Sequence, residues 1–164
     1  MKKLVIILLL LISVGFTSTA YAFSDVTNYQ EEINFLTAKD IIRGYENGTF
    51  GPGNPIKRIQ AVQMILREKG ITDYTAPNPN FTDMAPGDYG YPEVAKAVSM
   101  GFISGKTDQY GQKYFDPYGT LTRAQMAKIL AIAYNLQGLY FRDFSDVPKG
   151  NWAYEFVMAL AAHN

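Results

Sequence analysis

Cysteine is absent from this sequence of 164 residues. Without a thiol the chain forms no disulfide. It also cannot be a lipoprotein, because such a protein carries its lipid on a cysteine at the cleavage site. A catalytic cysteine–histidine pair is excluded for the same reason. The single histidine, His163, is the second-last residue, where chains tend to fray. A fold built from this chain must therefore be held together by packing alone.

An excess of charge of either sign is absent as well. Fifteen basic residues balance fifteen acidic ones, which leaves no electrostatic argument for nucleic-acid binding. Apolar residues make up 48% of the chain and charged residues 18%, a composition typical of a packed core and not of a disordered chain. The length fits a single domain.

Sequence motifs of known catalytic and metal sites are missing. There is no Gly-x-Ser-x-Gly elbow and no set of ligands at zinc spacing. Two polar loops, residues 46–54 and 108–116, do not match an EF-hand, and Lys113 intrudes into the second. We therefore expect plain turns there, and a chain without catalytic residues, cofactor or metal.

Residues 1–22 have the pattern of a secretory signal. Lys2 and Lys3 form a basic start, residues 4–16 form an apolar run, and Ala20-Tyr21-Ala22 is a cleavage site. The run is shorter than an ordinary transmembrane helix, which makes an uncleaved anchor the less favoured alternative. Cleavage before Phe23 leaves 13 basic and 15 acidic residues, a net charge of about −2. We expect an exported protein without membrane attachment after cleavage.

A short motif opens three repeats. It reads Phe23-Ser24-Asp25-Val26, Phe81-Thr82-Asp83-Met84 and Phe144-Ser145-Asp146-Val147, at intervals of roughly sixty residues. The aspartate of each motif suits a turn or a helix cap. An amphipathic helical pattern follows each motif. Its expected buried positions are Ile33, Leu36 and Ile41, then Val94, Ala97, Val98 and Phe102, then Phe156, Val157, Leu160 and Ala161.

The first two repeats close with a second helix. Thr122 and Gln125 form a capping box at its start in the second repeat, after a Phe-x-Pro turn. Its apolar face comprises Met126, Ile129, Leu130, Ala133 and Tyr134. The first repeat has an arginine and a glutamine, Arg58 and Gln60, at matching spacing. Gly44 and Gly105 are expected in a left-handed conformation after the first helix of each repeat.

The predicted boundaries are residues 23–76, 81–138 and 144–164 for the three repeats. The third repeat stops after its first helix, so we expect it to be incomplete. An apolar helix face without a partner would then favour self-association through this repeat.

These motifs resemble the S-layer homology repeat of bacterial cell-surface proteins. That repeat opens with Phe-x-Asp-Val, continues with a Trp-Ala-x helix and Gly-Ile-x-Gly, and closes with Phe-x-Pro and an Ile-Thr-Arg-Ala-Glu helix start. The second repeat matches best, with Leu121-Thr122-Arg123-Ala124-Gln125, and the first departs at Lys57 and Ile59. Both have glutamine, Gln60 and Gln125, where glutamate is usual.

The resemblance implies a mainly α-helical, pseudo-threefold bundle of tandem helix-loop-helix repeats at the cell wall. It also implies non-covalent binding to the secondary cell-wall polysaccharide attached to peptidoglycan, often carrying pyruvate ketals. The family's binding grooves lie between adjacent repeats and use the arginine of the Thr-Arg-Ala-Glu motif, which corresponds to Arg123 and Arg58. The family's tryptophan corresponds to Trp152, and Tyr89 takes its place in the second repeat.

A helix start offers N–H groups and the positive end of the helix dipole, and an arginine adds a planar fork that matches a carboxylate. We predict that Arg123 is the principal residue that binds an anionic sugar. For Arg58 we weigh a binding role and a structural role equally. The full set of candidate ligand-binding residues is Arg123, Arg58, Trp152, Tyr89, Thr122 and Gln125.

Alternatives remain at this point. The arginines would be structural if they paired with Asp25, Asp83 or Asp146, and large aromatic residues are more often core than sugar platforms. The chain could be a structural or self-associating surface protein. It could also be the N-terminal anchor of a larger exported enzyme. A polysaccharide pull-down separates wall binding from a purely structural role.

Overall fold

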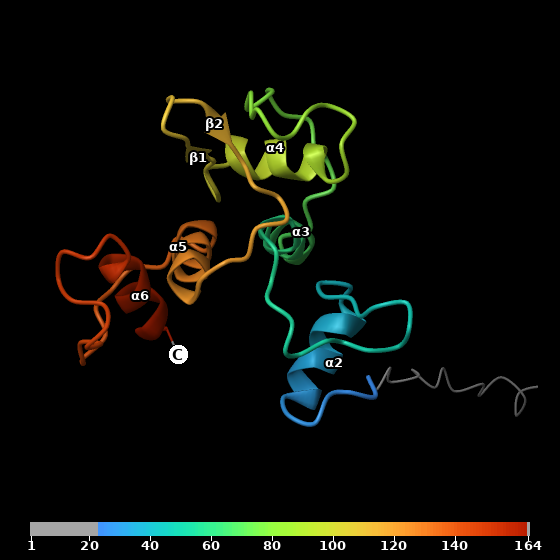
Figure 1. Ribbon diagram of the computed structural model, residues 1–164. Coiled ribbons are helices and arrows are strands. Elements are labelled where there is room, and N and C mark those ends of the chain that lie inside the picture. The colour runs from blue at the N-terminus through green and yellow to red at the C-terminus, as the bar shows by residue number, and fades with distance from the viewer. Residues whose placement is uncertain (1–22, 164) are drawn as a thin grey trace, which may run out of the picture.

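A computed structural model describes residues 23–163, so the predicted signal sequence lies outside the described residues. Within this range the regular structure is five helices and one hairpin (Figure 1). The elements are α2 (Gln30–Ala38), α3 (Arg58–Glu68), α4 (Tyr91–Ser99), β1 (Lys106–Thr107), β2 (Lys113–Tyr114), α5 (Arg123–Ala133) and α6 (Tyr154–Ala161). The predicted mainly helical fold is confirmed. No helix between residues 23 and 163 has both the length and the apolar character needed to span a membrane.

In the first and second repeats, a glutamine side chain caps the start of the second helix. Before α5, Thr122 Oγ1 accepts a hydrogen bond from the Gln125 amide at 3.2 Å, and Gln125 Oε1 accepts one from the Thr122 amide at 3.0 Å. This confirms the predicted capping box. Before α3, Gln60 Oε1 accepts from the Lys57 amide at 2.8 Å, but a lysine side chain has no acceptor with which to complete the box.

In the first repeat, the opening motif holds the segment that precedes the second helix. The two carboxylate oxygens of Asp25 accept hydrogen bonds from the amides of Phe50 and Gly51 at 2.8 and 2.7 Å. The rings of Phe23 and Phe50 lie with centroids 5.4 Å apart. The aspartate therefore makes a contact across 25 residues instead of the predicted local turn or cap. We call this arrangement the clasp.

The second repeat forms the same clasp. Asp83 accepts from the amides of Phe115 and Asp116, both at 2.7 Å, and the rings of Phe81 and Phe115 are 5.5 Å apart. Each clasp fastens an opening motif to a closing segment, which we define as residues 50–68 in the first repeat and 115–133 in the second. A repeat is therefore stabilised by long-range contacts as well as by its helices.

The predicted left-handed conformation of Gly44 and Gly105 is wrong. The helices α2 and α4 end earlier, and the left-handed residues after them are Asp40 and Gly101, with φ of 55° and 74°. Gly44 and Gly105 are instead sites of close approach to the clasp. A Cβ on Gly105 would overlap the Phe81 ring and lie 2.9 Å from the carbonyl oxygen of Tyr114.

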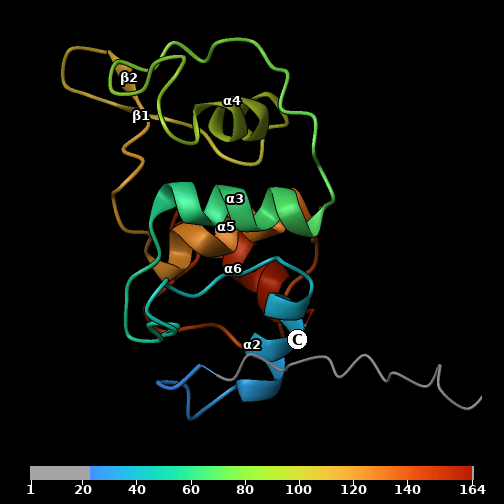
Figure 2. The same ribbon diagram turned by 90° about the vertical axis from the view of Figure 1, so that its right-hand side faces the viewer.

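Each second helix packs against the first helix of the next repeat. The helix α3 packs on α4, and α5 packs on α6. The segments that lead into α3 and α5 are joined by an antiparallel bridge between Lys57 and Thr120, so the two second helices start side by side, as Figures 1 and 2 both show. The repeats therefore interlock in sequence order.

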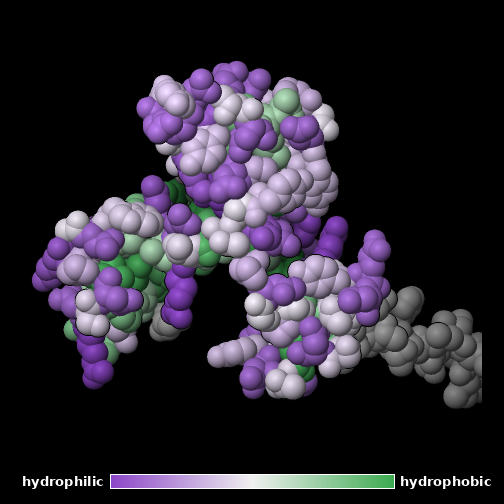
Figure 3. Space-filling view, viewed as in Figure 1, coloured by the Kyte–Doolittle hydropathy of each residue, from purple (hydrophilic) through white to green (hydrophobic). Residues whose placement is uncertain are grey.

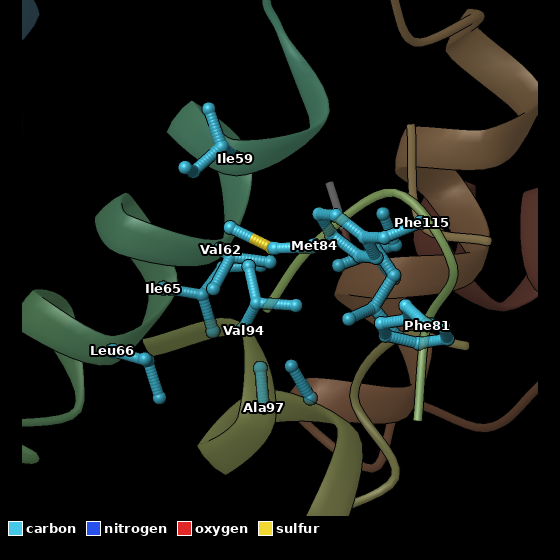
Figure 4. Packing of buried hydrophobic residues seen from close by; sticks show 12 residues of the cluster. Ile59, Val62, Ile65, Leu66, Phe81, Met84, Val94, Ala97 and Phe115 are labelled. Carbon is cyan, nitrogen blue, oxygen red and sulfur yellow. The ribbon is translucent and has the colours of Figure 1, made fainter. Parts of the chain in front are cut away.

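The core lies between α3, α4 and α5 and includes the second clasp. Figure 4 shows the side chains of α3 facing Val94 and Ala97 of α4, both of which were predicted to be buried. The buried cluster consists of Ile59, Val62, Ile65, Leu66, Phe81, Met84, Val94, Ala97, Ile103, Phe115, Ile129 and Ala133.

The outer helices depart from the predicted burial. No residue of α2 is fully buried, and Ile33 and Leu36 are only half-buried. The buried residues of α6 are Tyr154, Met158 and Ala159, whereas Phe156, Val157, Leu160 and Ala161 are half-buried. The prediction selected the wrong face of α6, because a helix that is apolar nearly all round does not show its buried side by pattern.

Candidate ligand-binding grooves

Two grooves occupy equivalent places, one in the second repeat and one in the first. The first, which we call the Trp152 groove, has a volume of about 390 Å³. Its floor comes from the segment after α4 and from one face of α5, and its edges come from the neighbouring repeats. The lining residues are Arg58, Gly101, Phe102, Ile103, Ser104, Gly105, Lys106, Gln125, Lys128, Ile129, Ile132 and Trp152.

The second, which we call the Tyr89 groove, has a volume of about 450 Å³. It lies between the segment after α2 and one face of α3, with Tyr89 at the edge where the other groove has Trp152. The lining residues are Ile42, Arg43, Gly44, Tyr45, Phe50, Gly51, Pro52, Asn54, Pro55, Ile56, Gln60, Gln63, Met64, Arg67 and Tyr89.

Arg58 joins the first repeat to the Trp152 groove of the second. Its Nε donates to the carbonyl oxygen of Phe115 at 2.7 Å, and its Nη2 donates to that of Ser104 at 3.0 Å. Its guanidinium lies 4.8 Å from the centre of the Phe115 ring. Arg58 is only 5% exposed, although it carries a charge. The side chain is therefore fixed by the repeat that follows it.

The charge of Arg58 is not neutralised by a direct ion pair with a described residue. Burial lowers the pKa of Arg58 from its ordinary value, while the carboxylates of Asp116 and Asp83 oppose that change. A guanidinium keeps its proton under such a shift. Arg58 does not form the direct ion pair with Asp25, Asp83 or Asp146 that the structural alternative predicted. Its hydrogen-bond partners are carbonyl oxygens.

Two lysines add positive charge to the Trp152 groove. Lys106 Nζ lies 2.5 Å from Asp116 Oδ2, and this ion pair lowers the pKa of Asp116. Lys128 Nζ lies over the Phe156 ring, 5.5 Å from its centre. The lining of the groove includes three cationic side chains and no carboxylate. The arrangement suits an anionic ligand.

The Tyr89 groove has two arginines. Arg43 forms a two-point pair with Asp40, with both distances at 2.6 Å, which raises the pKa of Arg43 and lowers that of Asp40. Arg67 donates to the carbonyl oxygen of Ile41 at 3.4 Å. Gln63 Nε2 donates to the hydroxyl of Tyr89 at 3.3 Å, so the aromatic edge is tethered to α3. This lining also contains no carboxylate.

The structure brings three of the predicted site residues together. Arg58, Gln125 and Trp152 line the Trp152 groove, and Trp152 is 57% exposed. Tyr89 lies at the other groove and is 67% exposed. Thr122, the N-cap of α5, lines neither groove.

Arg123 has different surroundings from Arg58. It is the first residue of α5, is exposed, and lines neither of the two grooves. Arg58 reaches into the repeat that follows its own, and no closing segment follows α6 within the described residues. The two arginines match in the sequence, but only Arg58 lies in a groove.

Sequence reasoning found Arg58 but missed Lys106 and Lys128 of the Trp152 groove, and it missed both arginines of the Tyr89 groove. Four residues of α5 line the Trp152 groove, and their equivalents in α3 line the other. The spacing i, i+3, i+4, i+7 places each set on one helix face. Comparing this face between repeats would have identified the residues, which are Gln125, Lys128, Ile129 and Ile132 in α5 and Gln60, Gln63, Met64 and Arg67 in α3.

Comparison with known proteins adds an independent observation. A family model described as the S-layer homology domain matches residues 22–62 and 80–127, more than half of the chain. The chain is 32% identical over 145 residues to an uncharacterized cell wall amidase of Bacillus anthracis, covering 85% of this chain and 26% of that protein. It is 29% identical over 129 residues to the S-layer protein sap of the same organism, covering 76% of this chain and 15% of that protein. The chain spans about a quarter or less of the length of these two relatives.

Proposed function

The chain belongs to the S-layer homology domain family, and from this premise we propose that it is an exported, non-catalytic anchor that binds secondary cell-wall polysaccharide at the bacterial surface. Membership of the family supports the surface location and the anchoring role. The choice of a polysaccharide ligand rests on the chemistry of the two grooves. We assign no catalytic role to His163, whose Nδ1 lies 2.8 Å from the carbonyl oxygen of Ala159 on its own helix.

The observation that carries this proposal is the positive charge of the grooves in a chain that has no excess of basic residues. Cationic side chains line both grooves, and the lining residues include no aspartate or glutamate. Lys106 and Arg43 are paired with Asp116 and Asp40 outside the lining, whereas Arg58, Lys128 and Arg67 form no ion pair with a described residue. A sugar that carries a pyruvate ketal presents a carboxylate beside an apolar sugar face. Charge-assisted hydrogen bonds would hold the carboxylate, and the exposed ring of Trp152 or Tyr89 would cover the sugar face.

Within the Trp152 groove, Lys128 and Gln125 are the most available polar contacts. The guanidinium of Arg58 already donates to two carbonyl oxygens, so we propose that it contributes positive charge and shape while Lys128 makes the direct contact. We propose that Arg123 likewise contributes positive charge and shape to a groove when a further closing segment packs beside it. Thr122 supports that role by fixing the start of α5.

We also propose the pseudo-threefold arrangement that the family implies. The packing of α3 on α4 is repeated by that of α5 on α6, and Figure 1 shows α3 and α5 near the centre with α2, α4 and α6 around them. The second helix of a third repeat would lie beside α3 and α5, would pack on α2 and would complete this arrangement. The succession of the α3–α4 and α5–α6 pairs along the chain supports this architecture.

Co-sedimentation of the purified chain with cell-wall sacculi tests the function. We expect the chain from residue 23 onward to sediment with intact sacculi and to stay in solution after the polysaccharide has been removed chemically. Trp152→Ala should weaken sedimentation about tenfold, because aromatic anchors dominate such contacts. Lys128→Gln should weaken it several-fold, with a stronger effect at low salt.

Tyr110→Ala is the matched control for the aromatic substitution. Tyr110 is 78% exposed in the turn between β1 and β2 and lines neither groove, so its loss should leave sedimentation unchanged. The proposal fails if the stripped sacculi bind as well as intact ones, or if Trp152→Ala and Tyr110→Ala behave alike.

A further inference from the structure

The two grooves differ at one equivalent point on their helix faces. Gln63 of α3 and Lys128 of α5 each lie three residues after the glutamine that caps their helix, and each lines its groove. Lys128 is half-buried over the ring of Phe156, with its Nζ 5.5 Å from the ring centre. Figure 3 shows hydrophobic residues gathered over α5 and α6, the helices that carry these two side chains. A cation among apolar groups is screened less by water, which strengthens its attraction for an anion.

The Tyr89 groove has a carboxylate behind the equivalent point. Glu93 lies four residues after Tyr89, and the residue four positions after Trp152 in the other groove is Phe156. Gln63 Nε2 donates to the Tyr89 hydroxyl and to Glu93 Oε1, both at 3.3 Å. Both N–H groups of this amide are therefore engaged, and the group that it offers to a ligand is its carbonyl oxygen. An acceptor beside a carboxylate binds a sugar hydroxyl and disfavours an anion.

The two arginines of the Tyr89 groove do not reverse this difference. Asp40 binds Arg43 at two points, and the hydrogen bond from Arg43 and then the charge of Arg67 lower the pKa of Asp40. This carboxylate thus offsets positive charge at that end of the groove. Arg67 lies four residues after Gln63, roughly 6 Å farther along α3, and donates to the carbonyl oxygen of Ile41. The other polar side chains of the lining are uncharged, and they are Tyr45, Asn54, Gln60, Gln63 and Tyr89.

We propose that the two grooves bind different sugars of the polysaccharide. The Trp152 groove binds the sugar that carries the carboxylate, to which Lys128 donates. The Tyr89 groove binds an uncharged sugar, from whose hydroxyl the carbonyl oxygen of Gln63 accepts a hydrogen bond while the Tyr89 ring covers its apolar face. This inference rests on the proposed function and divides its ligand between the two grooves. An anchor that uses both grooves then recognises two kinds of sugar in one polymer.

Two-dimensional NMR spectra of the isotope-labelled chain from residue 23 onward test the proposal, because they report on both grooves in one sample. The indole N–H of Trp152, the only tryptophan, and the amide of Gly105 report on the Trp152 groove. The amide of Gly44, the equivalent glycine, reports on the Tyr89 groove. The probes are soluble oligosaccharides released from the sacculi, used with their pyruvate ketals in place or after mild acid has removed the ketals.

The two grooves should respond differently to the loss of the ketals. At Trp152 and Gly105, we expect ketal removal to weaken binding about tenfold or more, because the charge-assisted hydrogen bond is lost. At Gly44, the two oligosaccharides should bind with affinities within about threefold of each other. High salt should weaken binding of the ketal-bearing oligosaccharide at the Trp152 groove and change binding at the Tyr89 groove little.

Lys128→Gln gives the Trp152 groove the side chain that the Tyr89 groove has at the equivalent point. It should reduce the effect of ketal removal at Gly105 to within about threefold and leave the response of Gly44 unchanged. Lys113→Gln is the matched control for charge. Lys113 is exposed and lines neither groove, so its substitution should change neither response.

The outcomes separate this inference from the proposed function. Equal weakening at both grooves on ketal removal would overturn the division of ligands and leave the proposed function in place. A Gly44 amide that does not respond to the oligosaccharide without ketals would overturn it as well. If neither groove responds to either oligosaccharide, the proposed function itself fails, and this inference fails with it.

Discussion

Arg58 and Arg123 are matched in the sequence but differ in burial, and this difference predicts very different effects for the same substitution. In Arg58→Lys, an ammonium group replaces a fork that reaches the carbonyl oxygens of Phe115 and Ser104. A point charge satisfies one of these and leaves the other in a buried site. A hydrogen bond to a charged group contributes about 1.5–3 kcal/mol, so we expect a loss of about 2 kcal/mol in the free energy of unfolding.

Arg123→Lys is the internal control. Arg123 is exposed at the first position of α5, and lysine and arginine have similar helix propensities. The free energy of unfolding should therefore change by less than about 0.5 kcal/mol. Urea unfolding followed by circular dichroism measures both variants. An unchanged dependence on urea concentration would show that the compactness of the two end states is preserved. If both substitutions cost the same within about 0.5 kcal/mol, the structural role that we assign to Arg58 is refuted.

The remaining predictions concern the clasps. The amide of Phe50, followed by that of Gly51, holds the pKa of Asp25 below its ordinary value of 3.8, against the opposing effect of burial. The resulting stability is present above about pH 4 and is lost as the pH falls through the lowered pKa. Asp25→Asn should therefore destabilise the chain at pH 7 and lose less stability on acidification than the parent, in urea unfolding at a series of pH values; an identical pH profile would contradict this. Gly105→Ala should cost about 1–3 kcal/mol, because the added methyl meets the Phe81 ring and a carbonyl oxygen. Gly53→Ala, where no atom lies within 4 Å, should be neutral or slightly stabilising, and equal melting temperatures for these two variants would argue against the close approach.

Local features of the fold could be predicted from the sequence because they depend on neighbouring residues. The capping box of Thr122 and Gln125 uses groups three residues apart, and the helical periodicity of α4 correctly placed Val94 and Ala97 in the core. The repeats themselves were visible as three copies of one motif. The family followed from those motifs, and comparison with the family model confirmed it.

The long-range arrangement could not be predicted in the same way. The sequence showed an aspartate near the start of each repeat, but not that Asp25 and Asp83 would bind amides 25 to 33 residues away. It predicted a left-handed role for Gly105, whereas the structure requires a small residue there because the Phe81 ring lies against it. Such contacts depend on distances that only the folded chain defines.

The sequence by itself determined the repeats, the helix starts and the composition of each helix face. The tertiary structure decided which repeat each face meets. Because α3 packs on α4 and α5 packs on α6, the residues of a second helix take part of their surroundings from the repeat that follows. This is why Arg58 is buried beside Phe115 in a groove while Arg123, at the matching position of its repeat, is exposed. Each arginine is the first residue of its helix, and the neighbouring repeat that covers Arg58 accounts for their difference in burial.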